Sequence, residues 1–360
     1  MHIALIPLVF LPKYTGGGEV WMSGIARELH SKGHKVSILT AEDSAFQISG
    51  SVSKVQSYDD EWEGLPVRRL YFDKISTGQP SPWYDTTNPS IAEAVTSFLM
   101  DCRPDVVHLT CGQHLSASPI LAAQAIGLPT VLTLIGFWYI CPLTTLLRPD
   151  GNLCPGRKTG IECLSCLASR SRNSRVLKQL PHKFRSLVSA VNLQTMLLAR
   201  ASVSLQLVRA VDQRDAVFTE ALRGVDRILA PSTALRDIFV QSGIIGADQI
   251  MYWPYSIEVA YASQGSDKSP SNVLRIGYTG HMLRQKGVDV LIKAVRNLSL
   301  DIPLQLRLYG ALDKDMEYGK ELVALASNDP RILFLGRFDN RRIGEILREI
   351  DVVVVPSIWS

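Results

Sequence analysis

The feature that most limits the possible folds is the segment of residues 275–295, with the sequence RIGYTGHMLRQKGVDVLIKAV. Residues 275–279 are typical of a buried strand, and Gly280 opens a polar loop. After Gly287, apolar side chains recur at helical spacing, at Val288, Leu291, Ile292 and Val295. A strand, a tight loop and a helix start bring together free backbone N–H groups and the positive end of a helix dipole. The segment therefore predicts a site for an anion such as a phosphate.

Lys286 lies at the predicted start of this helix. Its ammonium group would neutralise part of the charge of a bound diphosphate as a point charge. The residues alone fit equally well an ordinary strand-to-helix turn that carries a surface lysine. Both interpretations stay open at this point, and both require a strand followed directly by a helix.

The rest of the chain repeats this alternation of strand and helix. Strands are predicted at 3–10, 36–40, 66–72, 106–110, 130–135 and 225–230, and then at 273–279, 304–309, 332–335 and 352–355. Helices are expected up to residue 32, near 90–102, after the candidate N-cap Ser232, and at 287–299, 315–327 and 340–348. Such alternation of buried strands with helices is typical of doubly wound α/β domains with parallel sheets.

Length and local composition predict two such domains. A chain of 360 residues can form two sizeable cores. Residues 255–272 are rich in Ser, Gly, Lys and Pro, so this segment is the expected linker. We therefore predict a first domain over residues 1–255 and a second over residues 273–360. The first would carry an insertion at about 140–222, which contains cysteines and basic helical sequence.

Three consecutive glycines, Gly16, Gly17 and Gly18, follow the first strand. Their backbone can approach a ligand phosphate closely because no side chain stands in the way. The spacing departs from the dinucleotide-binding fingerprint, and only Glu42 or Asp43 stands where that motif places its ribose-binding acid. A dehydrogenase is therefore disfavoured, whereas a plain tight turn stays an alternative to phosphate binding.

Charge and the N-terminal sequence narrow the class of protein. The formal net charge is only +4, so charge gives no indication of nucleic-acid binding. Residues 1–10 are apolar but lack a basic leader and a cleavage site. Residues 120–147 are interrupted by Gly and Pro, and they fit a helix, a turn and a strand better than a membrane span. We expect a cytoplasmic protein, in which the six cysteines would not form a disulfide framework.

Four of these cysteines, Cys141, Cys154, Cys163 and Cys166, lie within 26 positions of one another. The last two have the spacing with which two thiolates grip one tetrahedral ion. A structural zinc is one interpretation, and an iron–sulfur cluster is a less suitable metal centre for this spacing. The alternative is a set of reduced thiols in an ordered loop.

Residues 164–211 contain no Asp or Glu, and basic residues alternate with apolar ones from 170 to 209. A basic helical region with an apolar stripe suits an anionic membrane surface or a lipid-linked phosphate. It suits equally a solvated pair of helices packed on the first domain. The first interpretation predicts a peripheral protein on the inner face of a membrane.

Several phrases of the sequence together resemble the retaining, two-domain glycosyltransferases of family 4. They are GGGE and GHKVSILT at residues 16–19 and 33–40, DVVHLT at 105–110, VDRILAPSTAL at 225–235 and TGHMLRQKGVDVLIKA at 279–294. The resemblance implies the GT-B fold, in which two Rossmann-like domains face a cleft. It also implies transfer of a sugar from a nucleotide sugar to an acceptor hydroxyl with retention, and no metal cofactor for catalysis.

The resemblance assigns candidate roles in both domains. His108 and Lys286 would be catalytic, with either His281 or Arg284 assisting the lysine. The donor-binding candidates are Gly16, Gly17, Gly18, Gly280, His281, Arg284, Lys286 and Ser357, and the acceptor-side candidates are Glu19, His108 and Phe137. Many relatives have a polar residue at the strand end that Ile135 and Gly136 occupy here, and neither of these side chains can move a proton.

In the family, the phrase VVVVPS found here at residues 352–357 precedes a helix with two glutamates that hold the donor ribose and face the sugar. That helix would lie beyond Ser360, so the resemblance predicts an incomplete second domain and a chain that is inactive as given. The parent enzyme would act in cell-surface polysaccharide or glycolipid synthesis, with a lipid-linked or saccharide acceptor. The alternatives are a nucleotide-sugar-binding protein without activity and a phosphorylase or epimerase on the same fold. Donor sugar, base, acceptor and oligomeric state stay open.

Overall fold

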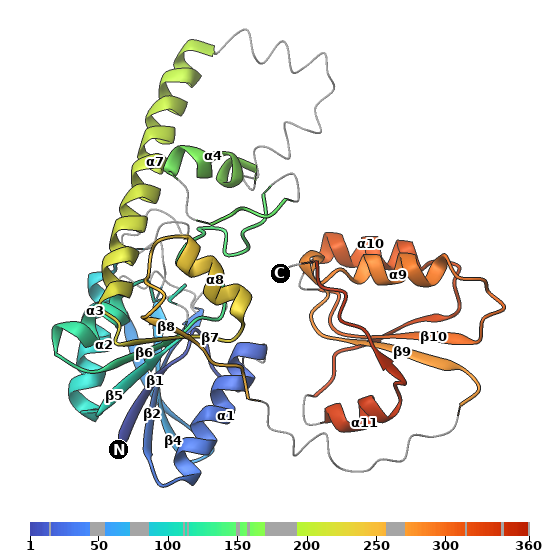
Figure 1. Cartoon of the computed structure of the whole chain (residues 1–360), viewed down its shortest axis with the longest axis horizontal. Helices are drawn as coiled ribbons and strands as arrows, with labels where there is room; N and C mark the ends of the chain where they lie inside the picture. The colour runs from blue at the N-terminus through green and yellow to red at the C-terminus, as the bar shows by residue number, and fades with distance from the viewer. Residues whose placement is uncertain are drawn as a thin grey trace. The chain divides into compact units, whose positions relative to one another are not determined.

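The computed structural model describes residues 1–13, 16–43, 55–72, 86–110, 112–113, 115–148, 152–156, 159–169, 193–256, 271–313, 315–339 and 342–358. The chain divides into two compact units, Met1–Ser256 and Ile257–Ser360. Each unit has its own sheet with helices packed against it (Figure 1).

The first unit contains an eight-stranded sheet in the order β3-β4-β2-β1-β5-β6-β7-β8. Its strands are β1 (His2–Ile6), β2 (Lys35–Asp43), β3 (Gln56–Trp62), β4 (Leu65–Phe72), β5 (Val106–Leu109), β6 (Thr130–Thr133), β7 (Arg227–Ala230) and β8 (Ile250–Tyr252). β3 and β4 pair antiparallel, whereas the other described pairs are parallel. The central strand β1 is well covered, and its Ala4 and Leu5 are fully buried.

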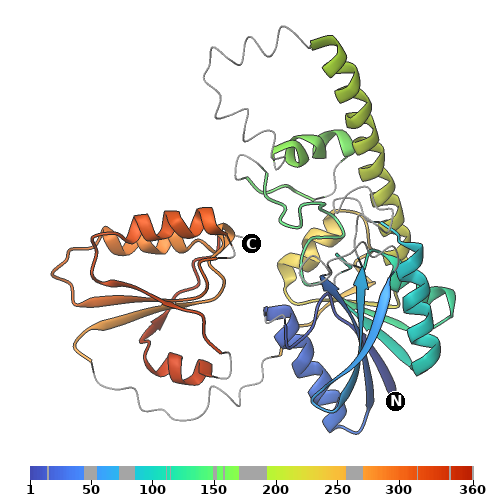
Figure 2. The same ribbon diagram turned by 180° about the vertical axis from the view of Figure 1, so that it is seen from behind.

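Helices cover this sheet on both faces, as a doubly wound fold requires. They are α1 (Gly17–Ser31), α2 (Pro89–Cys102), α3 (Ser118–Ala125), α4 (Gly160–Ser169), α7 (Leu193–Arg223) and α8 (Thr233–Gln241). Figures 1 and 2 show α1 on the opposite side of the sheet from α2 and α3. The predicted N-cap Ser232 is confirmed, because its hydroxyl accepts a hydrogen bond of 3.1 Å from the backbone N–H of Leu235.

Two strands of this sheet have no counterpart among the sequence predictions. β3 reads QSYDDEW, and most of its side chains are exposed or half-buried, so the apolar signal of a strand is weak. It forms because Glu63 and Gly64, both with positive φ, turn the chain back onto β4. β8 lies at the edge of the sheet beside β7, and its three residues IMY are apolar but too few to show the pattern of a strand.

The second unit contains a parallel four-stranded sheet in the order β11-β10-β9-β12. Its elements are β9 (Leu274–Thr279), the 3-10 turn η3 (Arg284–Lys286), α9 (Val288–Arg296), β10 (Leu304–Tyr309), α10 (Met316–Ala326), β11 (Ile332–Gly336), α11 (Ile343–Arg348) and β12 (Val352–Val353). α9 and α10 cover one face of the sheet, and α11 lies on the other (Figure 1). The larger core lies beneath α9 and α10, with Leu306, Leu308 and Tyr318 fully enclosed.

The predicted order of elements in this unit is confirmed, but one detail is wrong. The sequence pattern predicts a strand over residues 352–355. The ladder includes only Val352 and Val353, whose exposed fractions are 47% and 46%. β12 is an edge strand that pairs with β9 alone among the described strands, so its outer side chains have less cover than those of a central strand.

No described helix combines the length and the hydropathy needed to cross a bilayer. Membrane contact through the basic segment is not tested by the structure, because residues 170–192 lie outside the described part of the chain. α7 begins at Leu193, and its side chains are described only from Val208 onward. Membrane contact through residues 170–209 therefore stays a prediction.

Candidate functional site

At the carboxyl ends of the strands in the second unit, the backbone segments are closely packed against one another. Gly280 follows β9, and its N–H donates to the carbonyl of Tyr309 over 3.0 Å. Gly310 follows β10 and packs so tightly on the carbonyl of Gly280 that a Cβ atom at position 310 would collide with it. Parallel sheets bind ligands at this edge, where loops and helix starts converge. The predicted loop of residues 280–287 lies there.

This loop is anchored at both ends, and Lys286 lies within it. Met282 is completely buried beneath α9 and α10 and joins the core. Residues 284–286 form the turn η3, and Gly287 ends the turn with a φ of +65°, a backbone conformation that favours glycine. Lys286 is half-buried and its backbone N–H donates to the carbonyl of Leu283 over 2.8 Å, whereas its ammonium group has no hydrogen-bond or ion-pair partner among the described residues. Its ammonium group is thus available to a ligand.

Arg284, one of the two candidates to assist the lysine, has a different set of contacts. Its guanidinium pairs with the carboxylate of Glu321 on α10 at 2.8 Å and lies 4.8 Å from the centre of the Tyr318 ring. These contacts attach η3 to α10, so Arg284 holds the loop in place. The other candidate for contact with a phosphate is His281. It is half-buried, and its carbonyl accepts a hydrogen bond of 2.7 Å from the hydroxyl of Tyr278.

The start of α9 carries its own negative charge. Asp289 lies in the first turn, where a carboxylate partly compensates the positive end of the helix dipole. Its Oδ1 accepts a hydrogen bond of 2.7 Å from the Tyr318 hydroxyl, and its Oδ2 accepts one of 2.9 Å from Lys293. These two bonds help to hold the pKa of Asp289 below its usual value, although burial opposes them. The helix end therefore attracts an anion less strongly than the sequence suggests, which leaves Lys286 as the principal positive charge of the loop.

In the first unit, the glycine turn lies beside the end of β6. Gly16 is the N-cap of α1 and has an extended backbone, and the Glu19 carboxylate folds back against it. Gly18 faces Ile135, whose Cδ1 atom would lie 3.6 Å from a Cβ at position 18. The glycine turn, which the sequence assigns to donor binding, and the strand end at Ile135 are thus neighbours. The predicted acceptor-side residue Phe137 is 4% exposed and belongs to the core of this unit.

His108 lies on β5 in the same region. Its Nε2 atom is 2.8 Å from the hydroxyl of Thr133 on β6, and the ring of Trp21 contacts it edge-on at 6.2 Å between centres. Burial lowers the pKa of His108 to about 4, so the imidazole is neutral at physiological pH. A neutral imidazole offers one donor and one acceptor, and Thr133 occupies one of the two nitrogens. Nothing in the sequence marks Thr133 as a partner of His108, because only the pairing of β5 with β6 brings the two together.

Glu42, the acid considered as a ribose ligand, forms other interactions. Glu42 is 4% exposed, and its carboxylate accepts hydrogen bonds of 2.7 Å from Arg69 and 3.0 Å from Lys13. Arg69 also donates to the carbonyl of Leu11 over 2.7 Å. These contacts hold the segment that precedes the glycine turn. They leave Glu42 in a buried ion pair, which weakens the dehydrogenase alternative further.

The four cysteines considered as metal ligands line one cavity of about 500 Å³. None of the four forms a disulfide within the described part of the chain, and burial raises the pKa of Cys163 to about 12 with a smaller contribution from neighbouring thiols and Asp215. In the part of the chain that the structure describes, no three His, Cys, Asp or Glu side chains are grouped in a way that could hold a metal ion. The structure thus gathers Cys141, Cys154, Cys163 and Cys166 round one space, and zinc binding stays a prediction.

Comparison with known proteins identifies the family of both units. The family model described as a glycosyl transferase 4-like domain matches residues 16–158, and the model described as glycosyl transferases group 1 matches residues 273–360. Together they cover more than half of the chain. A protein of Klebsiella pneumoniae, described as an uncharacterized 42.6 kDa protein in the cps region, is 20% identical over the whole of this chain and 80% of its own length.

Solved structures share the fold. The catalytic domain of starch synthase IV from Arabidopsis thaliana, bound to ADP and acarbose, is 15% identical, with a TM-score of 0.59 over 99% of this chain and 78% of that one. The Anabaena protein Alr3699/HepE in complex with UDP is 16% identical, with a TM-score of 0.57 over 99% of this chain and 74% of that one. The fold is that of the GT-B glycosyltransferases, with parallel Rossmann-like sheets. The chain therefore belongs to the glycosyltransferases, with a glycosyl transferase 4-like domain followed by a domain of glycosyl transferases group 1.

Proposed function

We propose that the protein transfers a sugar from a nucleotide sugar to an acceptor hydroxyl with retention of configuration, as a member of glycosyltransferase family 4. The observation that carries this proposal is the loop of residues 280–287. Its backbone is anchored by Met282 and Gly287, and it presents the Lys286 ammonium without a partner among the described residues. A nucleoside diphosphate is the ligand whose charge this arrangement would complement.

The proposed reaction follows from that complementarity. The bond between the anomeric carbon and the diphosphate oxygen breaks, and the acceptor oxygen forms a bond to the same carbon on the same face. The acceptor proton passes to the departing diphosphate, so a separate general base is not required. Lys286 would stabilise the negative charge that develops on the leaving group, with His281 as its partner. The glycine turn at Gly16, Gly17 and Gly18 would bind the donor phosphates from the first unit, and Ser357 would contact the donor.

The residues proposed for the acceptor side all belong to the first unit. His108 would orient the acceptor hydroxyl through its neutral imidazole, and Glu19 would contribute a carboxylate beside the glycine turn. Because Phe137 is buried, its contribution would be to the shape of the site. The relative in the cps region of Klebsiella pneumoniae supports an acceptor in cell-surface polysaccharide or glycolipid synthesis. Such an acceptor, lipid-linked or saccharide, fits a peripheral protein at the cytoplasmic face of a membrane.

A second candidate is a nucleotide-sugar-binding protein without transferase activity. The observation that favours it is the end of β6, where Ile135 and Gly136 offer no side chain that could handle a proton beside Gly18. Release of free sugar from a nucleotide sugar, or its transfer to an acceptor, separates an enzyme from a binding protein. Interconversion of nucleotide sugars without an acceptor would indicate an epimerase instead, and dependence on free phosphate would indicate a phosphorylase.

Thermal unfolding with UDP, ADP and GDP tests the donor site. A nucleotide present at 100 times its dissociation constant would stabilise the protein by about 2.7 kcal/mol. We expect a clear rise in Tm with one nucleotide for the native chain and for Lys320→Ala, which removes an exposed lysine of α10. Lys286→Ala should abolish this rise while leaving the Tm of the nucleotide-free protein unchanged. An equal rise in both variants would contradict the assignment of Lys286.

A further inference from the structure

We propose that Asp351 is a positioning residue for the phosphate loop, and that it acts on Lys286 through the edge strand β12. The inference rests on the proposed donor site and names a residue that controls its geometry. Asp351 lies outside the loop, at the opposite end of β12. The connection between the two can be followed residue by residue.

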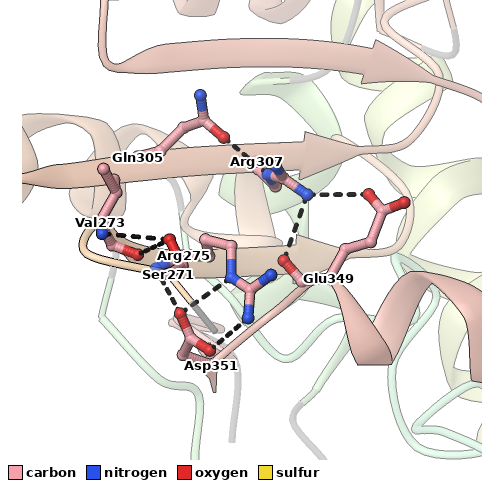
Figure 3. Close-up of polar contacts among 7 residues, drawn as sticks. All are labelled: Ser271, Val273, Arg275, Gln305, Arg307, Glu349 and Asp351. Atoms are coloured by element: carbon pink, nitrogen blue, oxygen red, sulfur yellow. Dashed lines mark hydrogen bonds and ion pairs between the residues drawn. The ribbon is translucent and has the colours of Figure 1, made fainter. Parts of the chain in front are cut away.

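The first step is the attachment of Asp351 to Arg275. The Asp351 carboxylate accepts hydrogen bonds from the guanidinium of Arg275 at 2.8 and 3.1 Å and from its backbone N–H at 2.8 Å. In return, the backbone N–H of Asp351 donates to the carbonyl of Arg275 over 2.8 Å. Arg275 is 8% exposed and the Asp351 side chain is 28% exposed, so the pair is partly shielded from competing water. Figure 3 shows the carboxylate held between the backbone and the side chain of Arg275.

The second step is the register of β12 on β9. The ladder pairs Val352 with Ile276 and Val353 with Gly277, and the N–H of Val354 donates to the Gly277 carbonyl over 2.8 Å. A strand with two ladder residues has little of its own to fix its position along a neighbour. The Arg275–Asp351 pair lies immediately before this ladder and therefore sets where β12 begins.

The third step carries the position of β12 to the loop. The N–H of Ile358 donates to the carbonyl of Gln285 over 3.1 Å. The carbonyl of Pro356 packs directly on Gly287, with no space for a side chain between them. Lys286 lies between these two contact points. A shift of β12 along β9 would therefore move both residues that flank Lys286 in the chain. The displacement would act over a distance, because Arg275 lies roughly 13 Å from the other end of β9.

The neighbouring ion pair in Figure 3 lacks this connection and provides the matched control. Arg307 on β10 donates to the carboxylate of Glu349 at 2.8 Å, and Glu349 is 61% exposed at its side chain. Glu349 precedes β12 and makes no ladder contact with β9. Glu349→Gln removes an ion pair close to the one in question but leaves the start of β12 attached.

Hydrogen exchange and nucleotide binding on the full chain test the inference together. Asp351→Asn keeps the size of the side chain and should fold, because Ile350 stays packed against Gly277. We expect faster exchange in peptides covering residues 284–287 and 356–358, and a Kd for the preferred nucleotide that rises roughly 2- to 30-fold. Glu349→Gln should match the native chain in both measurements. Asp351→Ala, checked for folding by circular dichroism, should have the larger effect.

The two readouts separate this inference from the proposed function. Faster exchange in Asp351→Asn, in a protein that binds no nucleotide, would support the mechanical connection and overturn the donor site. Nucleotide binding by the native chain, with unchanged exchange and Kd in both Asp351 variants, would overturn the positioning role and leave the donor site standing. A lower Tm of the nucleotide-free Asp351 variants, with an unchanged rise in Tm on adding nucleotide, would indicate that Arg275 and Asp351 form a structural pair only. This result would equally overturn the inference.

Discussion

The carbonyl oxygen of Pro356 occupies the space that any side chain at position 287 would need. Gly287 also has a φ of +65°, so two independent requirements select glycine at this position. The contact joins the end of the phosphate loop to the segment that follows β12. It makes Gly287 a sensitive point for both the stability of the second unit and the placement of Lys286.

Gly287→Ala should destabilise the second unit through both requirements. Gly336→Ala separates them, because Gly336 also has a positive φ, of +74°, but nothing lies within 4 Å of where its Cβ would be. We expect a cost of about 1–2 kcal/mol for Gly336→Ala from the backbone alone and a larger cost for Gly287→Ala. Urea unfolding of the two variants measures the difference. Equal losses of unfolding free energy would show that the backbone at Pro356 can move aside at no measurable cost in stability.

The buried pair between Glu42 and Arg69 should be important for the stability of the first unit. Both side chains are 4% exposed, and Glu42→Gln removes one of the two carboxylates that pair with Arg69, the other being Asp60 at 2.8 Å. Leaving a buried charge without its partner costs about 3–5 kcal/mol, and because Asp60 remains we expect a cost near the lower end of this range. Glu63→Gln, which breaks the exposed pair with Arg27, should cost less than about 1 kcal/mol. Chemical denaturation of both variants gives the comparison, and similar small costs would contradict the role assigned to Glu42.

His108 should make the stability of the protein depend on pH. Its pKa in the folded protein is about 4, below the value of about 6.5 expected for an unfolded chain. Between these values the unfolded state binds a proton that the folded state does not, so stability falls as the pH is lowered from about 6.5 to about 4. His108→Gln should reduce this fall. Unfolding free energies at pH 7.5 and pH 5 measure it, and parallel pH profiles for the two proteins would refute the shift.

The four-cysteine cavity gives a prediction about metal content. The zinc interpretation predicts about one zinc ion per purified chain, with the thiolates drawn closer together than they are in this structure. Cys163→Ser should lose the metal and lower the Tm, whereas Cys102→Ser, on α2 and away from the cavity, should retain it. Metal analysis by mass spectrometry and thiol titration provide the measurement. Four reactive thiols and no bound metal in the native chain would favour the interpretation as reduced thiols.

Much of the architecture follows from the sequence because it depends on local patterns. The apolar spacing at Val288, Leu291, Ile292 and Val295 predicted α9, and all four side chains are buried. Ser232 caps its helix through a hydrogen bond that requires only the next few residues. The strand β3 was missed for the same reason. It is polar, and it exists because a hairpin turn returns it to β4.

The sequence by itself determined the alternation of elements, the glycine turns and the placement of Lys286 at a strand-to-helix junction. Only the tertiary structure decided what the charged residues near them do. Arg284 is drawn to Glu321 on α10, and Glu42 is held between Arg69 and Lys13. The physical reason is that hydrogen bonds and ion pairs require groups within about 3 Å. Such groups lie 27 to 37 positions apart in this chain, so only the packing of strands and helices brings them together.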